Sequence, residues 1–341
     1  MPDVHNPTRW LGLDVAKATF HAALARADLN ARPPTREFAR SPDGARECLG
    51  WAEDLAPGTP LAAVMEATGG YSEPLARWLR GLRPELPVAI VNPRWVKHYG
   101  LSLGVRDKTD RVDAIVLATF GQERHPSAHV PMSEPYAILH AMVREREALL
   151  KAALAAENRD ELPSGSAVAQ EVRGAIIREM KAGIQRLDAA ILAHIKADEA
   201  LHADYRILVS IAGIGPVVAS GVMGELGDLR RFEDARKLSS FTGLAPKHRR
   251  SGTSLNAPPR MSKQGNPRIR RLLYMSALSV IRGDNDLATI YRSDITRGKP
   301  PKVALVGIMR RLLVLMRALL VEHRPFEPHH IKVWPEEVQA G

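Results

Sequence analysis

The spacing of apolar residues changes along the chain, and these changes predict where strands give way to helices. Before residue 130, short apolar runs are separated by clusters of Gly, Pro, Asn, Asp and Ser, a pattern typical of strands joined by turns. The expected strands are Trp10–Val15, Thr19–Ala25, Thr35–Ala39, Leu61–Met65 and Val88–Val91. Only Ala16-Lys17-Ala18 separates the first two strands, so they are expected to form a hairpin.

Helices are expected between these strands because capping residues precede apolar stripes of helical spacing. Ser41-Pro42-Asp43 places a capping serine before a proline, which predicts a helix over Pro42–Leu55. Ser72-Glu73-Pro74 opens a second helix, and Asp110–Phe120 has the pattern of a third. The predicted order is three strands, helix, strand, helix, strand, helix. This is the order of the ribonuclease H fold, whose two central strands run parallel and need helical crossovers.

The middle of the chain has a different period. From Glu134 to Arg206, apolar residues recur every third and fourth position among many charges, which predicts long packed helices. Pro163-Ser164-Gly165-Ser166 interrupts the pattern, so a helical hairpin or coiled coil is expected. Its apolar stripe is expected to serve dimerisation or to act as a spacer between domains.

The last region is predicted to be mostly helical. Gly213 and Gly215 form a Gly-Ile-Gly-Pro turn before an apolar helix, typical of a helix-hairpin-helix element whose turn amides meet a DNA phosphate. A tight structural turn is the alternative. Further helices are expected over Pro267–Ile281 and Lys302–Glu322, and the prolines after Arg324 predict a loose tail.

Charge adds an expected class of partner to this architecture. The 341 residues include 45% hydrophobic residues, enough for two or three domains with real cores. The net charge is +10, and the stretch Lys247–Arg271 holds eight Lys or Arg residues and no Asp or Glu. Because Gly, Ser and Asn are interleaved with these cations, a nucleic-acid surface is favoured over a merely solvated one.

Cysteine content and hydropathy exclude several classes of protein. Cys48 is the single cysteine, so there is no disulfide framework and no cysteine-based metal site. The segment Met1-Pro-Asp-Val-His lacks a secretory pattern, and no apolar run is long enough to span a bilayer. A reducing cytoplasm is therefore the expected location.

Four carboxylates stand where the predicted sheet would bring them together. Asp14 ends the first strand, Glu66 follows the fourth, and Asp110 and Asp113 lie three apart on one face of a helix. Asp14 is flanked by strand hydrophobics, so its charge needs a functional reason. Carboxylates can hold the Mg²⁺ ions that assist phosphoryl transfer, and the group therefore predicts a metal site. Sugar kinases and actin-like ATPases share the first-strand pattern, but Gly69-Gly70 alone is too weak to be their phosphate loop.

A serine in the basic stretch is a candidate nucleophile. Ser251 is expected in a loop among cations, followed by Gly252 and by a second candidate, Ser254. Nearby Lys and Arg can offset phosphate charge, while a metal-bound hydroxide or a carboxylate from elsewhere can remove the serine proton. A phosphate contact through the hydroxyl is the alternative.

Together these segments resemble one family, the transposases of insertion-sequence family 110, which are related to the Piv-type DNA invertases. The resemblance covers nearly the whole chain. It is carried by Gly12-Leu13-Asp14-Val15, Met65-Glu66-Ala67-Thr68-Gly69-Gly70-Tyr71, Val91-Asn92-Pro93, Lys108-Thr109-Asp110-Arg111-Val112-Asp113-Ala114, Gly213-Ile214-Gly215, Ser251-Gly252 and Ser262-Lys263-Gln264-Gly265-Asn266.

The resemblance implies an α/β plus α architecture in four parts. These are a RuvC-like domain with an Asp-Glu-Asp-Asp Mg²⁺ site (1–130), a coiled-coil dimerisation hairpin (131–205), a serine transposase domain (206–325) and a flexible tail (326–341). It also implies a homodimer that assembles into a tetramer on donor and target DNA, guided by a structured bridge RNA and associated with the nucleoid when active.

Residue roles follow from the matching motifs. The metal ligands are Asp14, Glu66, Asp110 and Asp113, and Ser251 is the nucleophile because it precedes the motif glycine, with Ser254 as the alternative and Ser262 less favoured. The expected nucleic-acid contacts are Lys108, Arg111, Gly213, Gly215, Lys247, Arg249, Arg250, Lys263, Asn266, Arg268, Arg270 and Arg271.

Two other interpretations stay open. One is a metal-only RuvC-like endonuclease or junction resolvase that uses water and leaves Ser251 as a phosphate contact. The other is a non-catalytic RNA- or DNA-binding protein that keeps the fold. A tyrosine recombinase is disfavoured, because Tyr274 and Tyr291 lie in helical stretches without a clear Arg-His-Arg constellation.

Overall fold

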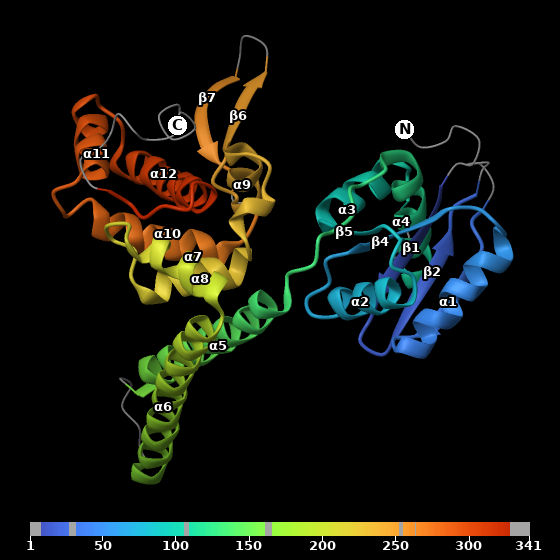
Figure 1. The fold of residues 1–341 in the computed structure, drawn as a ribbon, viewed down its shortest axis with the longest axis horizontal. Coiled ribbons are helices and arrows are strands. Elements are labelled where there is room, and N and C mark those ends of the chain that lie inside the picture. The colour runs from blue at the N-terminus through green and yellow to red at the C-terminus, as the bar shows by residue number, and fades with distance from the viewer. Residues whose placement is uncertain are drawn as a thin grey trace. The chain divides into compact units, whose positions relative to one another are not determined.

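The computed structural model describes residues 8–26, 32–105, 109–160, 166–251, 255–262 and 264–327. The chain forms two compact units, Met1–Pro131 and Met132–Gly341 (Figure 1).

The first unit is a five-stranded sheet with helices on both faces. Its elements are β1 (Arg9–Val15), β2 (Thr19–Leu24), β3 (Thr35–Ala39), α1 (Pro42–Leu55), β4 (Leu61–Glu66), α2 (Ser72–Leu82), β5 (Val88–Val91), α3 (Pro93–Ser102) and α4 (Asp110–Arg124). The strand order is β3-β2-β1-β4-β5; β1–β2 and β2–β3 are antiparallel, whereas β1–β4 and β4–β5 are parallel. The predicted order of elements along the chain is confirmed except for one additional helix, and the predicted parallel pairing of the central strands is confirmed.

Helix α3 was not predicted. Asn92-Pro93 has the pattern of a strand-ending turn, yet Asn92 is the N-cap of α3 and its side chain accepts a hydrogen bond of 2.9 Å from the Arg94 amide. Pro93 then occupies the first turn, where its missing N–H costs nothing. The same two residues therefore end β5 and begin a helix.

Two separate cores sandwich the sheet. Helices α1 and α2 pack on one face through residues such as Cys48, Leu49 and Leu79, while α3 and α4 cover the other through residues such as Tyr99 and Leu117. Cys48 is buried, and burial raises the pKa of its thiol, so it behaves as the small apolar residue expected.

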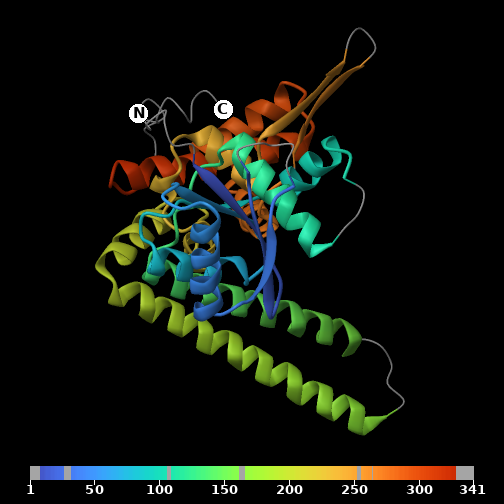
Figure 2. The same ribbon diagram turned by 90° about the vertical axis from the view of Figure 1, so that its right-hand side faces the viewer.

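The second unit is almost entirely helical. Its elements are α5 (Glu134–Asp160), α6 (Ala167–Ala197), α7 (Glu199–Val209), α8 (Pro216–Leu226), η1 (Leu229–Arg231), α9 (Ala235–Thr242), β6 (Pro246–Ser251), β7 (Leu255–Met261), α10 (Pro267–Val280), α11 (Asp286–Thr296) and α12 (Pro301–Val321). Helices α5 and α6 pack side by side as a long arm (Figure 2). The two long helices are as predicted, whereas their coiled-coil dimerisation stays a prediction.

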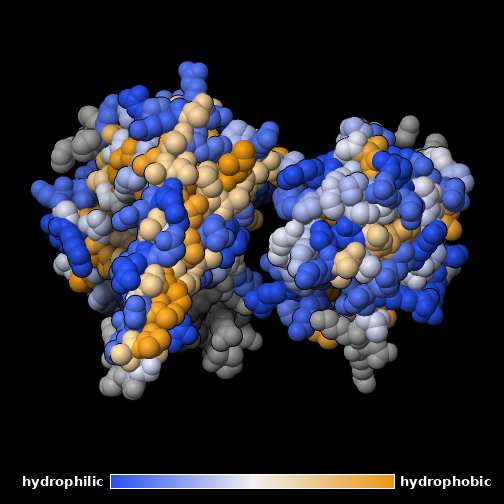
Figure 3. Space-filling model, turned by 90° about the horizontal axis from the view of Figure 1, so that it is seen from below, coloured by the Kyte–Doolittle hydropathy of each residue, from blue (hydrophilic) through white to orange (hydrophobic). Residues whose placement is uncertain are grey.

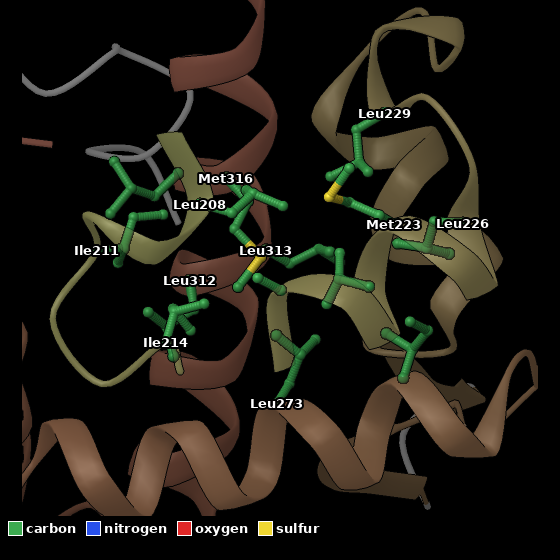
Figure 4. Close-up of a cluster of buried hydrophobic side chains, with 14 of the residues drawn as sticks. Leu208, Ile211, Ile214, Met223, Leu226, Leu229, Leu273, Leu312, Leu313 and Met316 are labelled. Atoms are coloured by element: carbon green, nitrogen blue, oxygen red, sulfur yellow. The ribbon is translucent and has the colours of Figure 1, made fainter. Parts of the chain in front are cut away.

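Helix α12 is the centre of the second core. Most of its residues between Ala304 and Leu320 are buried, including the whole run from Leu312 to Met316. Figure 4 shows Leu312, Leu313 and Met316 of α12 among side chains from α7, α8 and α10, including Leu208 and Leu273. Despite this apolar character, none of the described helices meets the length and hydropathy needed to cross a membrane.

The basic stretch contains a β-hairpin that was not predicted. Strands β6 and β7 pair antiparallel, with Ser251 opposite Leu255 at the tip end and Pro246 opposite Met261 at the root. The expectation of a loop around Ser251 was therefore wrong. The two strands contain charged residues, and β7 also contains two prolines, so they lack the apolar alternation by which a strand is predicted from sequence.

Candidate active site

The cleft of the first unit exists because α4 lies directly against the central strand β1. A Cβ on Gly12 would stand 2.2 Å from the backbone nitrogen of Ala118 and 2.3 Å from the carbonyl oxygen of Ala114. Only a residue without a side chain permits this approach. The close packing places the first turn of α4 beside the carboxyl end of β1, where Asp14 lies.

Three local features position the four predicted carboxylates. Asp14 is on β1, and Glu66 ends β4, the parallel neighbour of β1, with Leu13 paired to Met65. Asp110 and Asp113 lie in the first turn of α4, where negative charge is favoured by the helix dipole. Thr109 caps this turn by accepting a hydrogen bond of 3.3 Å from the Val112 amide.

All four carboxylates line one cleft of about 600 Å³. The sequence prediction that separate segments bring these residues to a single place is therefore supported by the geometry. Among the described residues, no three His, Cys, Asp or Glu side chains are already close enough to form a metal-ligand cluster. The four carboxylates therefore line one cleft without forming a preassembled ligand cluster.

Residues that the sequence did not point to line the cleft or contact one of its carboxylates. Lys97 and Leu101 of α3 contribute to its wall, because α3 itself was missed. His21 of β2 is the register partner of Asp14, and its Nδ1 lies 4.0 Å from Asp110 Oδ2 while its Nε2 lies 3.1 Å from Glu37 Oε2. A histidine at alternating register on the neighbouring strand is the signal that could have found it.

The serine candidate lies in the second unit, at the end of β6. Ser254, the alternative nucleophile, and the cation Lys263 lie outside the described residues, as does Lys108 of the first unit. Lys247, Arg249 and Arg250 are carried by the backbone of β6. The serine and three cations therefore belong to one two-stranded element.

The predicted nucleic-acid residues at the start of α10 have intramolecular partners, and their contacts with nucleic acid stay a prediction. Asn266 and Arg268 contact the buried carboxylate of Glu225, and Arg271 donates a hydrogen bond to Glu147. Arg270 Nη1 donates a 3.0 Å hydrogen bond to the carbonyl of Thr242, and burial lowers the pKa of its guanidinium.

The two turn glycines and Arg111 complete the set. Gly213 has φ +82°, and a Cβ there would lie 2.3 Å from Val280 Cγ2, so packing alone already requires glycine. Gly215 is the N-cap of α8, and a Cβ on it would meet nothing within 4 Å. Arg111 is exposed in the first turn of α4. Of the turn residues, Gly215 leaves the most room for a phosphate.

Acidic side chains at the carboxyl ends of parallel central strands, in a sheet of ribonuclease H order, are characteristic of enzymes that act on phosphodiesters. The comparisons with known proteins agree with this class. Residues 11–160 match a DEDD-type IS110 model described as Transposase, and residues 205–292 match the model Transposase IS116/IS110/IS902 family.

The similarity to individual proteins extends over nearly the whole chain. The pilin gene-inverting protein of Moraxella bovis is 30% identical over 320 residues, covering 93% of this chain and 97% of the relative. The transposase for insertion sequence element IS1111A of Coxiella burnetii is 25% identical, covering 77% of this chain and 78% of the relative. The chain therefore belongs to the IS110 family of transposases and DNA invertases, and DNA recombination is the activity class of the protein.

One solved structure is also similar to part of the chain. It is T. thermophilus RuvC in complex with Holliday junction substrate, with a TM-score of 0.25 and 16% identity, covering 36% of this chain and 99% of that one.

Proposed function

We propose that the protein cuts and rejoins DNA through a phosphoserine intermediate on Ser251, assisted by Mg²⁺ at Asp14, Glu66, Asp110 and Asp113. The observation that carries the proposal is the convergence of these four carboxylates, from three separate segments, on one cleft of a family transposase. Family membership supplies the activity class, and the cleft supplies a place for its metal chemistry.

The cleft suits a divalent cation by the chemistry of its donors. Hard cations such as Mg²⁺ prefer carboxylate oxygens, and a few carboxylates from different elements suffice because Mg²⁺ keeps several waters. When bound, the cation would lower the cost of negative charge at the reacting phosphate. Asp14 and Glu66 would hold it from the strand ends, and Asp110 and Asp113 from the first turn of α4.

Ser251 would act on the phosphorus of a DNA phosphodiester. Its Oγ–P bond forms as the bond from phosphorus to a sugar oxygen breaks, and the serine proton passes through a carboxylate to the departing sugar hydroxyl. Attack by a second sugar hydroxyl reverses these changes on the new strand. The phosphodiester energy is kept in the serine ester, so rejoining needs no ATP.

The partners in this proposal are donor DNA, target DNA and a structured guide RNA. The protein would work as a homodimer that assembles into a tetramer, with the α5–α6 arm as the dimerisation element. Figure 3 shows apolar side chains gathered in a band along this arm, and Leu154, Val172 and Ile176 are among its exposed apolar residues. A band of this kind on a long helix pair is what a self-association surface requires.

The decisive experiment looks for the covalent intermediate. Labelled DNA is mixed with wild type, Ser251→Ala and Ser254→Ala, separated under denaturing conditions, and any shifted band is digested and mapped by mass spectrometry. The proposal expects an adduct on Ser251 that Ser251→Ala abolishes while DNA binding is nearly intact, because a hydroxyl supplies only about 0.5 to 1.5 kcal/mol to a many-contact complex.

Other outcomes would change the assignment in defined ways. An adduct on Ser254 moves the nucleophile by three residues and keeps the mechanism. Cleavage by Ser251→Ala with no adduct in wild type would establish the metal-only endonuclease instead. DNA or RNA binding that needs no metal, with no cleavage at all, would support the non-catalytic interpretation.

A mixing experiment tests how the two chemical groups cooperate. Ser251→Ala protein and Asp14→Asn protein are each expected to be inactive alone. Recombination restored by mixing them would show that one chain supplies the serine and another the carboxylate. No restoration, with both proteins still associating, would assign both groups to the same chain.

The guide RNA has its own test. The purified wild-type protein is expected to carry a structured RNA that can be extracted and sequenced, and recombination of DNA should depend on adding it back. Activity that persists after complete ribonuclease treatment would remove the RNA from the proposal without touching the serine chemistry.

A further inference from the structure

Glu225 is a buried carboxylate that neither the acidic cleft nor the basic stretch accounts for. It lies near the end of α8, and its side chain is 1% exposed. Charged side chains are seldom buried to this extent unless partners compensate the loss of hydration. The partners of Glu225 therefore indicate what the charge is for.

Small residues on α8 bring those partners within reach. A Cβ on Gly221 would stand 2.6 Å from Leu272 of α10, and one on Gly224 would stand 2.9 Å from Val143 of α5. Helices α5 and α10 consequently pack closely on α8. Glu225, the next residue after Gly224, lies where the arm, α8 and the beginning of α10 meet.

The two oxygens of Glu225 are held in different ways. Asn266 Nδ2 donates a hydrogen bond of 2.6 Å to Oε2. Oε1 lies 2.9 Å from Arg144 Nε of α5 and 3.7 Å from Arg268 Nε of α10, but neither contact reaches hydrogen-bond geometry. Asn266 thus supplies the well-formed bond, and the two arginines supply charge.

Asn266 is also the residue that fixes the start of α10. Its Oδ1 caps the helix by accepting from the Arg268 amide at 2.9 Å. The residue before it, Gly265, has φ +147° and packs so tightly that a Cβ would lie 2.6 Å from the backbone nitrogen of Gly243. Gly243 and Gly265 lie just outside the two strands of the hairpin, so Asn266 is anchored at the hairpin root.

Two further hydrogen bonds stabilise the hairpin root. The Ser262 amide donates to the carbonyl of Ala245 at 3.0 Å, joining the chain entering β6 to the chain leaving β7. Arg270 donates to the carbonyl of Thr242 at 3.0 Å, which ties α10 to the end of α9. The hairpin root is therefore fastened to the first turn of α10, and Asn266 connects that turn to Glu225.

We infer that Glu225 is a positioning residue: through Asn266 it fixes the root of the β6–β7 hairpin that carries Ser251, and through Arg144 it ties that root to the α5–α6 arm. The inference rests on the proposed role of Ser251 for its catalytic meaning but not for its structural test. A buried ion pair can often be replaced by apolar residues without loss of stability, so a positional role is a reason to keep one.

Substitutions at Asn266 separate capping from tethering. Ser and Asp cap helices about as well as Asn. Asn266→Ser keeps the cap and removes the bond to Glu225, while Asn266→Asp keeps the cap and places a second carboxylate against it. The matched control is Asn285→Ser, because Asn285 caps α11 in the same way but its Nδ2 donates to the carbonyl of Val280.

The first measurement is hydrogen exchange of the whole protein, followed in the peptides covering residues 243–251 and 255–267. Asn266→Ser is expected to speed exchange at the hairpin root about ten- to hundredfold, the range given by losing one hydrogen bond to a charged group. Asn266→Asp should speed exchange at the hairpin root more than Asn266→Ser does, although Asp and Ser cap the helix about equally well. Exchange in the first unit and in the Asn285→Ser control should not change.

The second measurement is the rate of adduct formation on Ser251, with DNA affinity measured in parallel. At saturating DNA, Asn266→Ser should slow the adduct, so that any change in DNA affinity at this predicted contact does not enter the rate. If wild type forms no adduct at all, the proposed chemistry fails but the exchange result still decides the positioning role. Unchanged exchange at the hairpin root in both Asn266 variants would overturn the inference.

The tie to the arm is tested with Arg144→Met. This variant should also speed exchange at the hairpin root, whereas Arg186→Met, which breaks an exposed pair with Glu179 on α6, should not. If Arg144→Met leaves hydrogen exchange at the hairpin root unchanged, the inferred link between the hairpin root and the arm is wrong.

Discussion

Gly12 decides how closely α4 approaches the central strand. Replacing it with Ala places a methyl group 2.2 Å from the backbone nitrogen of Ala118 and 2.3 Å from the carbonyl oxygen of Ala114. Backbone atoms cannot rotate away as a side chain can. Gly12→Ala should therefore destabilise the first unit by about 1 to 3 kcal/mol or more. Urea unfolding followed by circular dichroism measures this change.

Gly50→Ala is the control for this prediction. Gly50 lies in α1, where an added Cβ meets nothing within 4 Å. Its replacement should be neutral or stabilising by up to about 1 kcal/mol, because Ala is the better helix former. Equal destabilisation by both variants would show that the close packing of α4 on β1 does not depend on glycine at position 12.

The cleft carboxylates are expected to be needed for chemistry but not for folding. Asp14→Asn and Glu66→Gln each relieve repulsion among the carboxylates that line the cleft when metal is absent, so the melting temperature should hold or rise. Asp113→Asn also gives up a favourable helix-dipole interaction, so its melting temperature should change little. Recombination should be lost. Asp43→Asn, which alters an exposed carboxylate of α1, is the matched control and should recombine normally.

The same variants have a readout that does not depend on activity. Mg²⁺ should raise the melting temperature of wild type and Asp43→Asn but not of Asp14→Asn, because binding to the folded state stabilises it. Near wild-type recombination by Asp14→Asn in Mg²⁺ would rule out the metal-site proposal.

At the level of single residues, the sequence revealed the acidic group but not the uses of the cations. Asp14 stood out because a charge among strand hydrophobics is costly, and that cost is local. The contacts of Arg268 and Asn266 with Glu225 were not predicted, because Glu225 is 41 residues away from Asn266 along the chain, and their nucleic-acid contacts stay a prediction. A pairing at such distance depends on how three helices pack, which no local pattern records.

Among the elements, strands and capped helices were the predictable part. The serine cap of α1 is present as expected, with the Gly44 amide donating to Ser41 at 3.1 Å. Helix α3 was missed because Asn92-Pro93 serves equally well as turn and as cap. The β6–β7 hairpin was missed because its strands contain charged residues and prolines and lack apolar alternation.

One contact between elements should respond to pH. Glu147 of α5 accepts a hydrogen bond from Arg271 of α10. Burial raises the pKa of Glu147, but Arg271 and Lys151 outweigh it, so the pKa lies below its ordinary 4.5. The folded state therefore gains stability from this carboxylate above about pH 4.5 and loses it as the pH falls through the lowered value.

Thermal melts of wild type and Glu147→Gln at pH 7 and at about pH 3.5 test this contact. Because Arg271 is nearly half exposed, screening limits the difference at pH 7 to about 1 kcal/mol or less. The difference should shrink in acid. Glu179→Gln, in a fully surface pair with Arg186, should change little at either pH, and an undiminished Glu147→Gln effect in acid would contradict the assignment.

For the whole molecule, the order of elements in the first unit followed from the sequence, and the packing of the second did not. Parallel strands need crossover helices, so the period of the apolar residues largely determined the sheet. The second unit instead buries α12 among helices from several segments. Many arrangements of apolar helices satisfy the same periodicity, and the choice among them is made by close packing such as that of Gly221 on Leu272.

The net charge of +10 predicts DNA binding that weakens with salt. The structure indicates which cationic side chains can be replaced to test this prediction. Arg268 and Arg270 have intramolecular partners, so removing them would confuse binding with folding. Replacing Lys247, Arg249 and Arg250 of β6 by Ala should instead reduce the slope of log affinity against log salt. The reduction should be about 0.9 for each DNA phosphate that these side chains neutralise in the wild type. Fluorescence anisotropy with duplex DNA at several salt concentrations measures the slope.

A second triple variant separates the hairpin from general charge. Arg282, Arg297 and Lys302 are exposed positions in the same unit, and their replacement by Ala removes as much charge as the hairpin variant does. The salt slope of this control should stay nearly unchanged, because counterions are released only where cations meet phosphates. If both triple variants flatten the slope equally, general charge and not the hairpin governs binding. An unaltered slope in the hairpin variant would place the DNA surface elsewhere.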